Sequence, residues 1–305
     1  MKMFFAILFP FTLFAGLYMS GGIDYDSKSF GMRGSDFALI RSNNGFLSNP
    51  AKMSADHNDN YFYSTYKRYF SDVYLVGTQY VHPGLILKKY STGFSIAAVN
   101  YGDFVDMESN YTYRPYEIAL SVSQGYLLGE VMTGLNIHYI YSSISPEYNS
   151  SAFSADIAFL YSFMEGKAVF GAGIFNAGFQ IDPYYGTRES IDPIIRSAAS
   201  YRIKNIPLTL TLQKDYNLDH LNSLRVMAGF ELEAKENLIV RLGYDHRGSD
   251  WQIGDNNTRE KFGGLSLGAT VIISEIEYDF AYLINGGIEN EFSMSAGFKL
   301  NKFIK

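Results

Sequence analysis

The 305-residue sequence contains no cysteine, so no disulfide can form and no cysteine can carry a lipid anchor. Stability must therefore come from backbone pairing and side-chain packing. After residue 22 the chain has no continuously apolar run of about 18 residues, which excludes a bundle of membrane-spanning helices. The net charge of −6 gives no support for nucleic-acid binding. Low-complexity tracts and Pro/Gly/Ser linkers are also missing, so we expect one domain after the N-terminal stretch.

Aromatic residues, in contrast, are abundant. The chain has 25 Tyr and 24 Phe, an aromatic content of 16%, yet its mean hydropathy is only −0.07. A membrane barrel needs this combination, because amphipathic rings lie at both water–lipid boundaries while the inner face is polar. The composition therefore favours an outer-membrane protein over a soluble globular one.

The N-terminal stretch has the layout of a secretory signal peptide. Residues 1–3 are a short basic start, Phe4 to Tyr18 is almost continuously apolar, and small residues follow at 20–22. The apolar run is shorter than the roughly 20 residues that a spanning helix needs. We expect residues 1–22 to be a signal peptide and the protein to be exported, with a retained N-terminal anchor as the alternative.

Residues 23–58 contain a stretch that reads GMRGSDFALIRSNNGFLSNPAKM from Gly31 to Met53. Its glycines permit backbone conformations closed to other residues, and Asn49-Pro50 cannot continue a helix. Its apolar side chains need cover. Residues 23–58 are therefore predicted to fold as an N-terminal plug, with an ordinary loop packed on the domain as the alternative.

From residue 59 onward, apolar and polar side chains alternate with the two-residue period of β-strands. For example, Leu135, Ile137 and Tyr139 alternate with Asn136 and His138. The apolar faces are uniformly large, and the runs are about 9–11 residues long, the length that a tilted strand needs to cross a membrane. Strands of a soluble β-sandwich, the alternative fold, are nearer roughly 5–6 residues.

These patterns predict an all-β fold, a transmembrane antiparallel β-barrel formed by residues 59–305 with the plug in its lumen. At about 20 residues for each strand and its turn, the barrel has about 14 strands. An even-numbered closed barrel leaves no unpaired strand edge in the lipid. One candidate strand covers residues 83–90. The expected extracellular loops are 103–114, 143–151, 180–195 and 247–262.

Short motifs follow one another in a recognisable order. Gly31-Met-Arg-Gly34 precedes Asn49-Pro50-Ala51, and the later motifs are VNYGDF (99–104), GLNIHYIYSSI (134–144), NAG (176–178), RLGYDHRG (241–248), GLSLGATV (264–271), EYDFAY (277–282) and FSMSAGF (292–298). The first two resemble the plug signature of FadL-like barrels. The whole series resembles the PorV/PorQ family of FadL-like outer-membrane barrels, with spacing nearest to PorQ. Arg33, Ser48 and Lys52 depart from the family pattern.

The resemblance implies a barrel of about 14 strands in a Gram-negative outer membrane, with its N-terminus folded into the lumen. PorV/PorQ relatives serve type IX protein secretion. The implied function is therefore an accessory role in secretion, with secretion-system proteins or exported cargo as partners. FadL relatives instead pass hydrophobic molecules, so a diffusion channel for small hydrophobic ligands is the alternative. Outer-membrane lipid surrounds the barrel in either case.

No catalytic or cofactor motif stands out. A nucleophile elbow, a P-loop and an HExxH pattern are all missing. His138 and Asp156 fall on neighbouring predicted strands and could form an acid–base pair, but a lumen hydrogen-bond network is the favoured interpretation. The acidic segment 245–255, which contains His246, matches no metal-ligand spacing. We expect a non-enzymatic protein with no cofactor and no metal site.

The candidate functional residues belong to the plug and to the inner face of the barrel. The plug motif comprises Gly31, Gly34, Asn49, Pro50 and Ala51. Polar and charged residues in mid-strand are expected to face the lumen, where opposite charges pair; lining a passage is the alternative role. The lumen-facing candidates are Asn136, His138, Asp156, Arg225, Glu231, Arg241, Glu277 and Asp279.

Overall fold

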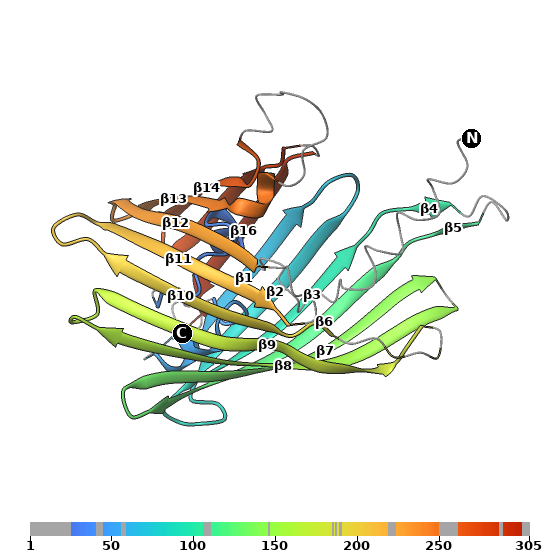
Figure 1. Ribbon diagram of the computed structural model, residues 1–305, viewed down its shortest axis with the longest axis horizontal. Helices are drawn as coiled ribbons and strands as arrows, with labels where there is room; N and C mark the ends of the chain where they lie inside the picture. The colour runs from blue at the N-terminus through green and yellow to red at the C-terminus, as the bar shows by residue number, and fades with distance from the viewer. Residues whose placement is uncertain are drawn as a thin grey trace.

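The computed structural model describes residues 26–40, 45–55, 59–105, 111–145, 147–184, 186, 188, 191–218, 224–249, 262–286 and 289–300. The predicted signal peptide lies outside these residues. Fourteen strands form a closed antiparallel barrel (Figure 1). The predicted fold class and strand number are confirmed.

The barrel strands follow one another around the wall in chain order. They are β1 (Tyr61–Arg68), β2 (Tyr74–Pro83), β3 (Ser91–Asn100), β6 (Tyr116–Leu128), β7 (Val131–Ser145), β8 (Tyr148–Phe163), β9 (Ala168–Asp182), β10 (Ile194–Arg202), β11 (Leu208–Asn217), β12 (Leu224–Lys235), β13 (Leu238–Asp245), β14 (Leu265–Ile273), β15 (Ile276–Ile284) and β16 (Glu291–Lys299). Pairing of β1 with β16 closes the barrel, with Tyr61 opposite Lys299 and Arg68 opposite Phe292.

Five short elements lie outside the barrel strands in the part of the chain that the structure describes. Between β3 and β6, β4 (Phe104–Val105) and β5 (Thr112–Tyr113) form a separate hairpin, and η3 (His246–Ser249) follows β13. The N-terminal segment, which we define as residues 26–40 and 45–55, carries α2 (Ser27–Gly31) and η2 (Pro50–Ser54). No helix in the described part of the chain is long and apolar enough to cross a membrane.

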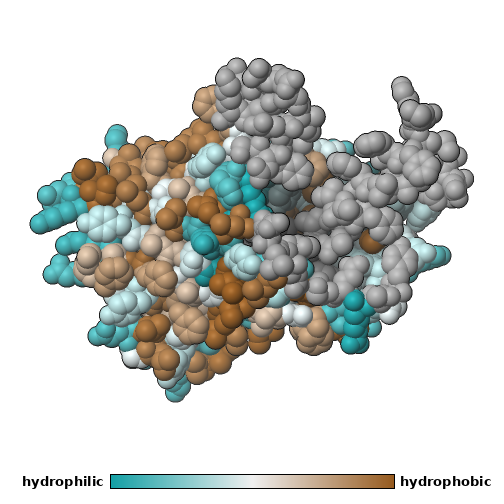
Figure 2. Space-filling model, viewed as in Figure 1, coloured by the Kyte–Doolittle hydropathy of each residue, from teal (hydrophilic) through white to brown (hydrophobic). Residues whose placement is uncertain are grey.

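The two-residue alternation of the sequence becomes the two faces of the wall. Leu120, Ile137 and Phe280 point outward and are 46%, 50% and 50% exposed, whereas their neighbours Ser121 and His138 point inward and are buried. Figure 2 shows hydrophobic side chains spread along the wall and hydrophilic ones at the tips of the turns. Large apolar residues therefore face the surroundings of the barrel, as membrane barrels require.

Antiparallel strands place the connections at two ends of the barrel. We call one the turn end, where the connections include 129–130, 164–167 and 274–275, and the other the loop end, where β3, β9 and β13 end and β6, β10 and β14 begin. Ser274 and Glu275 have φ of 50° and 72°. Two central residues with positive φ make the two-residue turn that suits the twist of antiparallel strands.

Two expectations about segments are wrong. Residues 83–90 are not a strand, because β2 ends at Pro83 and Gly84, with φ of 70°, starts the turn to β3. Residues 143–151 are not a long loop, because β7 extends to Ser145 and β8 begins at Tyr148, with Ser143 opposite Asn149. Polar side chains there suggested a loop, but a strand beyond the lipid can be polar on both faces.

Candidate functional site in the barrel lumen

Helix α2 is held against the inner faces of β15 and β16. Ser27 Oγ lies 2.7 Å from Ser293 Oγ and 2.6 Å from Ser295 Oγ, and Lys28 Nζ lies 2.6 Å from Glu277 Oε2. Charge-assisted hydrogen bonds are stronger than neutral ones. The predicted lumen residue Glu277 therefore serves to attach the N-terminal segment to the wall.

The Asn49-Pro50-Ala51 step starts η2. Asn49 Oδ1 accepts a hydrogen bond from Ala51 N at 2.9 Å, and Asn49 Nδ2 donates to Phe37 O at 2.8 Å. Pro50 suits the first helical position, where no N–H is required. One buried asparagine thus both caps η2 and joins the two halves of the segment.

Glycines let the segment and the wall approach closely. A Cβ added to Gly31 would lie 2.8 Å from Gly268 Cα, and a Cβ on Gly134 of β7 would overlap with the backbone of Pro50. Gly34 has φ of 80°, which suits glycine in the turn after α2. Glycine is thus required at these positions on both sides of the contact.

Asn136, His138 and Asp156 are brought together on β7 and β8. His138 Nε2 lies 2.8 Å from Asp156 Oδ2, and His138 Nδ1 lies 2.7 Å from Ser121 Oγ. Asn136 Nδ2 donates to Asp156 Oδ2 at 2.9 Å and to Phe46 O at 3.2 Å. The cluster therefore connects the wall to the N-terminal segment.

Asp156 also holds an irregularity in the wall. Asn176 has φ of 60° and lies where the register of β8 and β9 shifts, and its N–H donates to Asp156 Oδ1 at 2.9 Å.

The connection from Ser121 through His138 to Asp156 resembles a catalytic triad. However, Ser121 is in the middle of β6, which pairs on both sides, so its backbone N–H groups are not free to form an oxyanion hole. The cluster is suited to anchoring rather than acyl transfer.

A second group lies on β12, β13 and β15. Arg241 Nε donates to Glu231 Oε2 at 2.8 Å, and Arg241 Nη1 lies 3.8 Å from Asp279 Oδ1. Tyr63 donates its hydroxyl hydrogen to Asp279 Oδ2 at 3.0 Å. These carboxylates are buried, so the arginine and the tyrosine offset the loss of their hydration.

Arg225 lies apart from that group, nearer the loop end. Its Nε donates to Asp245 Oδ2 at 2.7 Å, and Arg33 of the N-terminal segment approaches the same carboxylate at 3.7 Å. All eight predicted lumen residues thus point inward, but they form separate groups and not one site.

Arg196 and Asp215 form a further inward-facing pair that is not among the residues predicted from the sequence. Arg196 Nε and Nη2 donate to the two Asp215 carboxylate oxygens at 3.0 and 2.9 Å. The guanidinium also lies 4.6 Å from the ring centre of Phe175 and 5.7 Å from that of Phe37. The alternation of β11 puts Asp215 on the inward face, so the strand pattern contained the signal for this pair.

Apolar side chains of the inner wall form more than one cluster. Those on β8, β9 and β10 pack against Phe37 and Ala38 of the N-terminal segment, whereas the cluster towards the loop end has no member from that segment. Small and branched apolar side chains on β2, β3, β6, β7 and β8 lie level with one another there. We call this the loop-end apolar cluster, and its buried members are Leu75, Ala97, Val99, Ala119, Ile140, Ala152 and Ile191. Tyr69, Val73 and Tyr101 pack against it.

A small cavity of about 90 Å³ lies between the N-terminal segment and β12–β15. Charged side chains line much of it, among them Lys28, Glu231, Arg241 and Glu277. Ligand pockets for apolar molecules are lined mainly by hydrophobic side chains, so this cavity suits water better.

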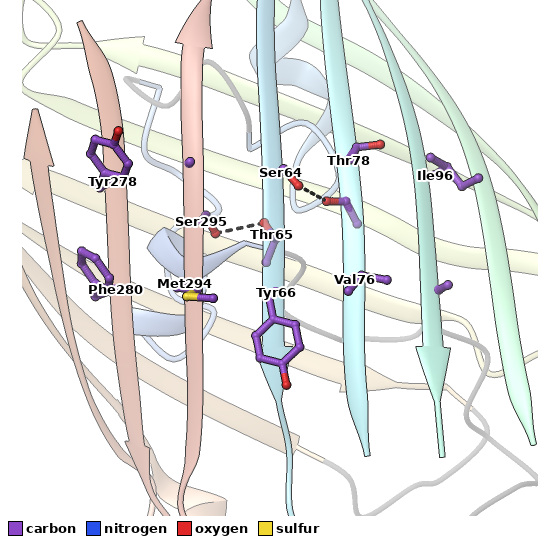
Figure 3. Close-up of a pocket in the computed structure, with 13 residues that line it drawn as sticks. Ser64, Thr65, Tyr66, Val76, Thr78, Ile96, Tyr278, Phe280, Met294 and Ser295 are labelled. Atoms are coloured by element: carbon purple, nitrogen blue, oxygen red, sulfur yellow. Dashed lines mark hydrogen bonds between the residues drawn. The ribbon is translucent and has the colours of Figure 1, made fainter. Parts of the chain in front are cut away.

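The outer wall carries a larger groove, of about 610 Å³, across β15, β16, β1, β2 and β3 (Figure 3). Ser64 and Thr78 lie between the larger outward side chains of Tyr66, Ile96 and Phe280 (Figure 3). The groove belongs to the outward face and is separate from the lumen. Among the residues that the structure describes, no three His, Asp or Glu side chains are grouped as a metal site would need.

Comparison of the sequence with protein families and with curated proteins finds no match. The structure does match solved barrels. The toluene transporter TbuX of Ralstonia pickettii has a TM-score of 0.60 at 10% identity, covering 90% of this chain and 98% of that one. The toluene transporter TodX of Pseudomonas putida scores 0.58 at 10% identity, covering 90% and 96%. A Pseudomonas aeruginosa FadL homologue scores 0.58 at 11% identity, covering 90% and 98%. The chain therefore has the fold of FadL-type outer-membrane barrels.

Proposed function

We propose that this protein is an outer-membrane channel that lets small hydrophobic molecules into the barrel from the loop end. The observation that carries the proposal is the match of the whole barrel to proteins described as toluene transporters. These neighbours are channels and transporters, which fits a protein without enzymatic activity. Because fold alone does not decide function, the apolar side chains on the inner wall are needed as further support.

The loop-end apolar cluster is the proposed entry surface. Ile140 is fully buried at the centre of this cluster, whereas the next inward residue towards the turn end, His138, begins the polar cluster. An apolar molecule that leaves water gains about 25 cal/mol for each Å² of apolar surface it buries. The cluster is therefore favourable for hydrocarbon and unfavourable for polar solutes.

The N-terminal segment is the proposed plug of this channel. Ser27 of the segment hydrogen-bonds to β16, and Ser35 of the segment lies 2.9 Å from Thr211 on β11. On another side of the wall, Asn136 of β7 donates to a backbone carbonyl of the segment. Attachment to strands on several sides of the wall keeps the segment across the lumen. A molecule that passes the apolar cluster must then move around the segment or displace it.

Uptake measurements test the channel. Cells that express the wild-type protein should take up labelled toluene faster than cells that lack it. Ile140→Asn should reduce this uptake several-fold because a buried amide disfavours hydrocarbon, and Ile140→Val should retain it. Both variants should keep the heat-modifiable gel mobility of a folded barrel. Equal uptake with and without the protein, or equal uptake by the two folded variants, would contradict the proposal.

An accessory role in type IX-like secretion is the second candidate function. It is supported by the resemblance of the sequence motifs to the PorV/PorQ family, and the predicted signal peptide and a Gram-negative outer-membrane location suit both candidates. A tagged protein should then copurify with secretion-system proteins or exported cargo. Recovery of the barrel alone, under conditions that preserve membrane complexes, would count against this role and leave the channel untouched.

A further inference from the structure

The turn from Gly84 to Tyr90, which reads GLILKKY, is unlike the other connections at the turn end. Leu85, Ile86 and Leu87 are 51%, 57% and 39% exposed, and the exposed Lys88 and Lys89 follow them. Four of the other turns at this end are short and contain an acidic residue, at 129–130, 164–167, 236–237 and 274–275, and the β10–β11 turn, 203–207, has a single large exposed apolar residue, Ile206. Three consecutive exposed apolar residues need an apolar environment.

The turn is closed by its own backbone. Gly84 N donates to Tyr90 O at 3.1 Å, and Tyr90 N donates to Leu87 O at 2.8 Å. The left-handed conformation of Gly84, with φ of 70°, brings the chain back, and a Cβ there would lie 2.7 Å from Lys88 O. The apolar residues are thus held in a defined arrangement next to the two lysines.

The turn lies against the outer face of the barrel. Ile86 N donates to Thr92 Oγ1 at 3.3 Å, and Thr92 in turn donates to Gln124 Oε1 at 2.7 Å. The ring of Tyr90 contacts that of Tyr126 edge-on, with 5.5 Å between centroids. Gln124 and Tyr126 alternate in step with the exposed Leu120 and Val122, so they point outward. The turn from β2 to β3 (Figure 1) therefore continues the outward apolar surface.

We propose that Gly84–Tyr90 is a lipid-binding element, which inserts Leu85, Ile86 and Leu87 at the membrane boundary and binds the phosphate of an anionic phospholipid with Lys88 and Lys89. Aromatic rings of a membrane barrel mark the boundary between lipid and water, and Tyr90 with Tyr126 sets that depth. Lysines at this depth keep their stems in the apolar region and their ammonium groups at the phosphates. The proposal does not depend on what the lumen transports.

Lipid retention tests the role of the lysines. The purified barrel is reconstituted in nanodiscs of phosphatidylcholine and phosphatidylglycerol, and retained lipids are counted by native mass spectrometry. The double variant Lys88→Gln/Lys89→Gln should retain phosphatidylglycerol several-fold less well than wild type. Lys204→Gln/Lys235→Gln removes the same charge from other exposed residues at the turn end and should retain it normally. Equal retention by both double variants would overturn the proposal.

Fluorescence tests the insertion of the apolar residues. The chain has one tryptophan, so Trp251→Phe gives a silent background. In this background, Ile86→Trp should be quenched by lipids brominated on the acyl chain and protected from aqueous iodide. Asn205→Trp, in the β10–β11 turn, should show the opposite behaviour. Iodide quenching of both tryptophans in folded protein would show that the turn lies in water.

Discussion

Lys52 Nζ lies 3.0 Å from Asp36 Oδ2 and 3.0 Å from Asp36 O, and the two side chains are 0% and 6% exposed. Asp36 also accepts hydrogen bonds from Ser29 Oγ at 2.7 Å and Ser48 Oγ at 3.1 Å. Burial alone would raise the pKa of Asp36, but the Lys52 ammonium and these hydrogen bonds hold it below its usual value. The pair joins the two halves of the N-terminal segment in ionised form.

Breaking this pair should loosen the N-terminal segment. Lys52→Met leaves the Asp36 carboxylate buried without its cation, which costs about 3–5 kcal/mol in comparable pairs. Limited proteolysis should then cut the segment much faster than in wild type while the barrel stays folded. Lys52→Met/Asp36→Leu, which removes both charges, should recover most of the protection. A double variant as sensitive to protease as the single one would show that the charge pair is not the cause.

The segment should also loosen as the pH rises. Burial and the neighbouring charge of Asp36 raise the pKa of Asp26 to about 7 from an ordinary value of 3.8. The folded state therefore keeps a proton that the unfolded chain releases, and the stabilisation is lost as the pH rises from about 4 through about 7. The lowered pKa of Asp36 acts only at more acidic pH.

Protease protection at pH 5 and pH 8 measures this effect. The wild-type segment should be better protected at the lower pH, and Asp26→Asn, which stays neutral, should reduce the difference. Asp26 also accepts a hydrogen bond from Ser29 N at 2.6 Å as the cap of α2, and asparagine keeps that acceptor. An unchanged pH dependence in Asp26→Asn would assign the effect to another group.

Asp156 should contribute more to barrel stability than its neighbour Ser154. Asp156→Ala removes the partner of His138 Nε2 and of the Asn176 N–H, and it leaves Asn136 Nδ2 with Phe46 O alone. Each buried group left unsatisfied costs about 1–3 kcal/mol. Ser154 is also buried and inward, but its hydroxyl has no hydrogen-bond partner among the described residues. Urea unfolding of the purified barrel should show a large loss for Asp156→Ala and little for Ser154→Ala. Similar midpoints for both variants would contradict the anchoring role.

Much of this barrel follows from alternation alone. The period of two in residues such as Leu135 to Tyr139 predicts which side chains face outward, and it puts Asn136 and His138 in the lumen. Alternation does not give the register between strands. Glu231 meets Arg241 because the β12–β13 pairing contains an irregularity at Glu233 and Lys235, which no periodic pattern reveals.

The two wrong segments fail for a related physical reason. In a membrane protein an exposed turn can be apolar, so the sequence of Leu85 to Leu87 has the composition expected of a strand. A strand beyond the lipid can be polar on both faces, so Ser142 to Ser150 imitate a loop. The alternation pattern does not distinguish a secretion accessory protein from a hydrophobic-molecule channel. Both have the same pattern of wall residues, and they differ in what the lumen and the loops contact.

Gly134→Ala should displace η2 and open the lumen to ions. A Cβ at Gly134 would overlap with backbone atoms of Pro50 and Ala51. Backbone atoms cannot avoid the overlap by a change of rotamer, so η2 as a whole must shift. Overpacking of this kind costs about 1–3 kcal/mol, so we expect larger single-channel conductance in planar bilayers and a lower unfolding midpoint. Gly77→Ala is the matched control, because its nearest neighbour is Ala97 Cβ at 3.3 Å and not the N-terminal segment. If Gly134→Ala folds and conducts no more than Gly77→Ala, the segment does not close the lumen.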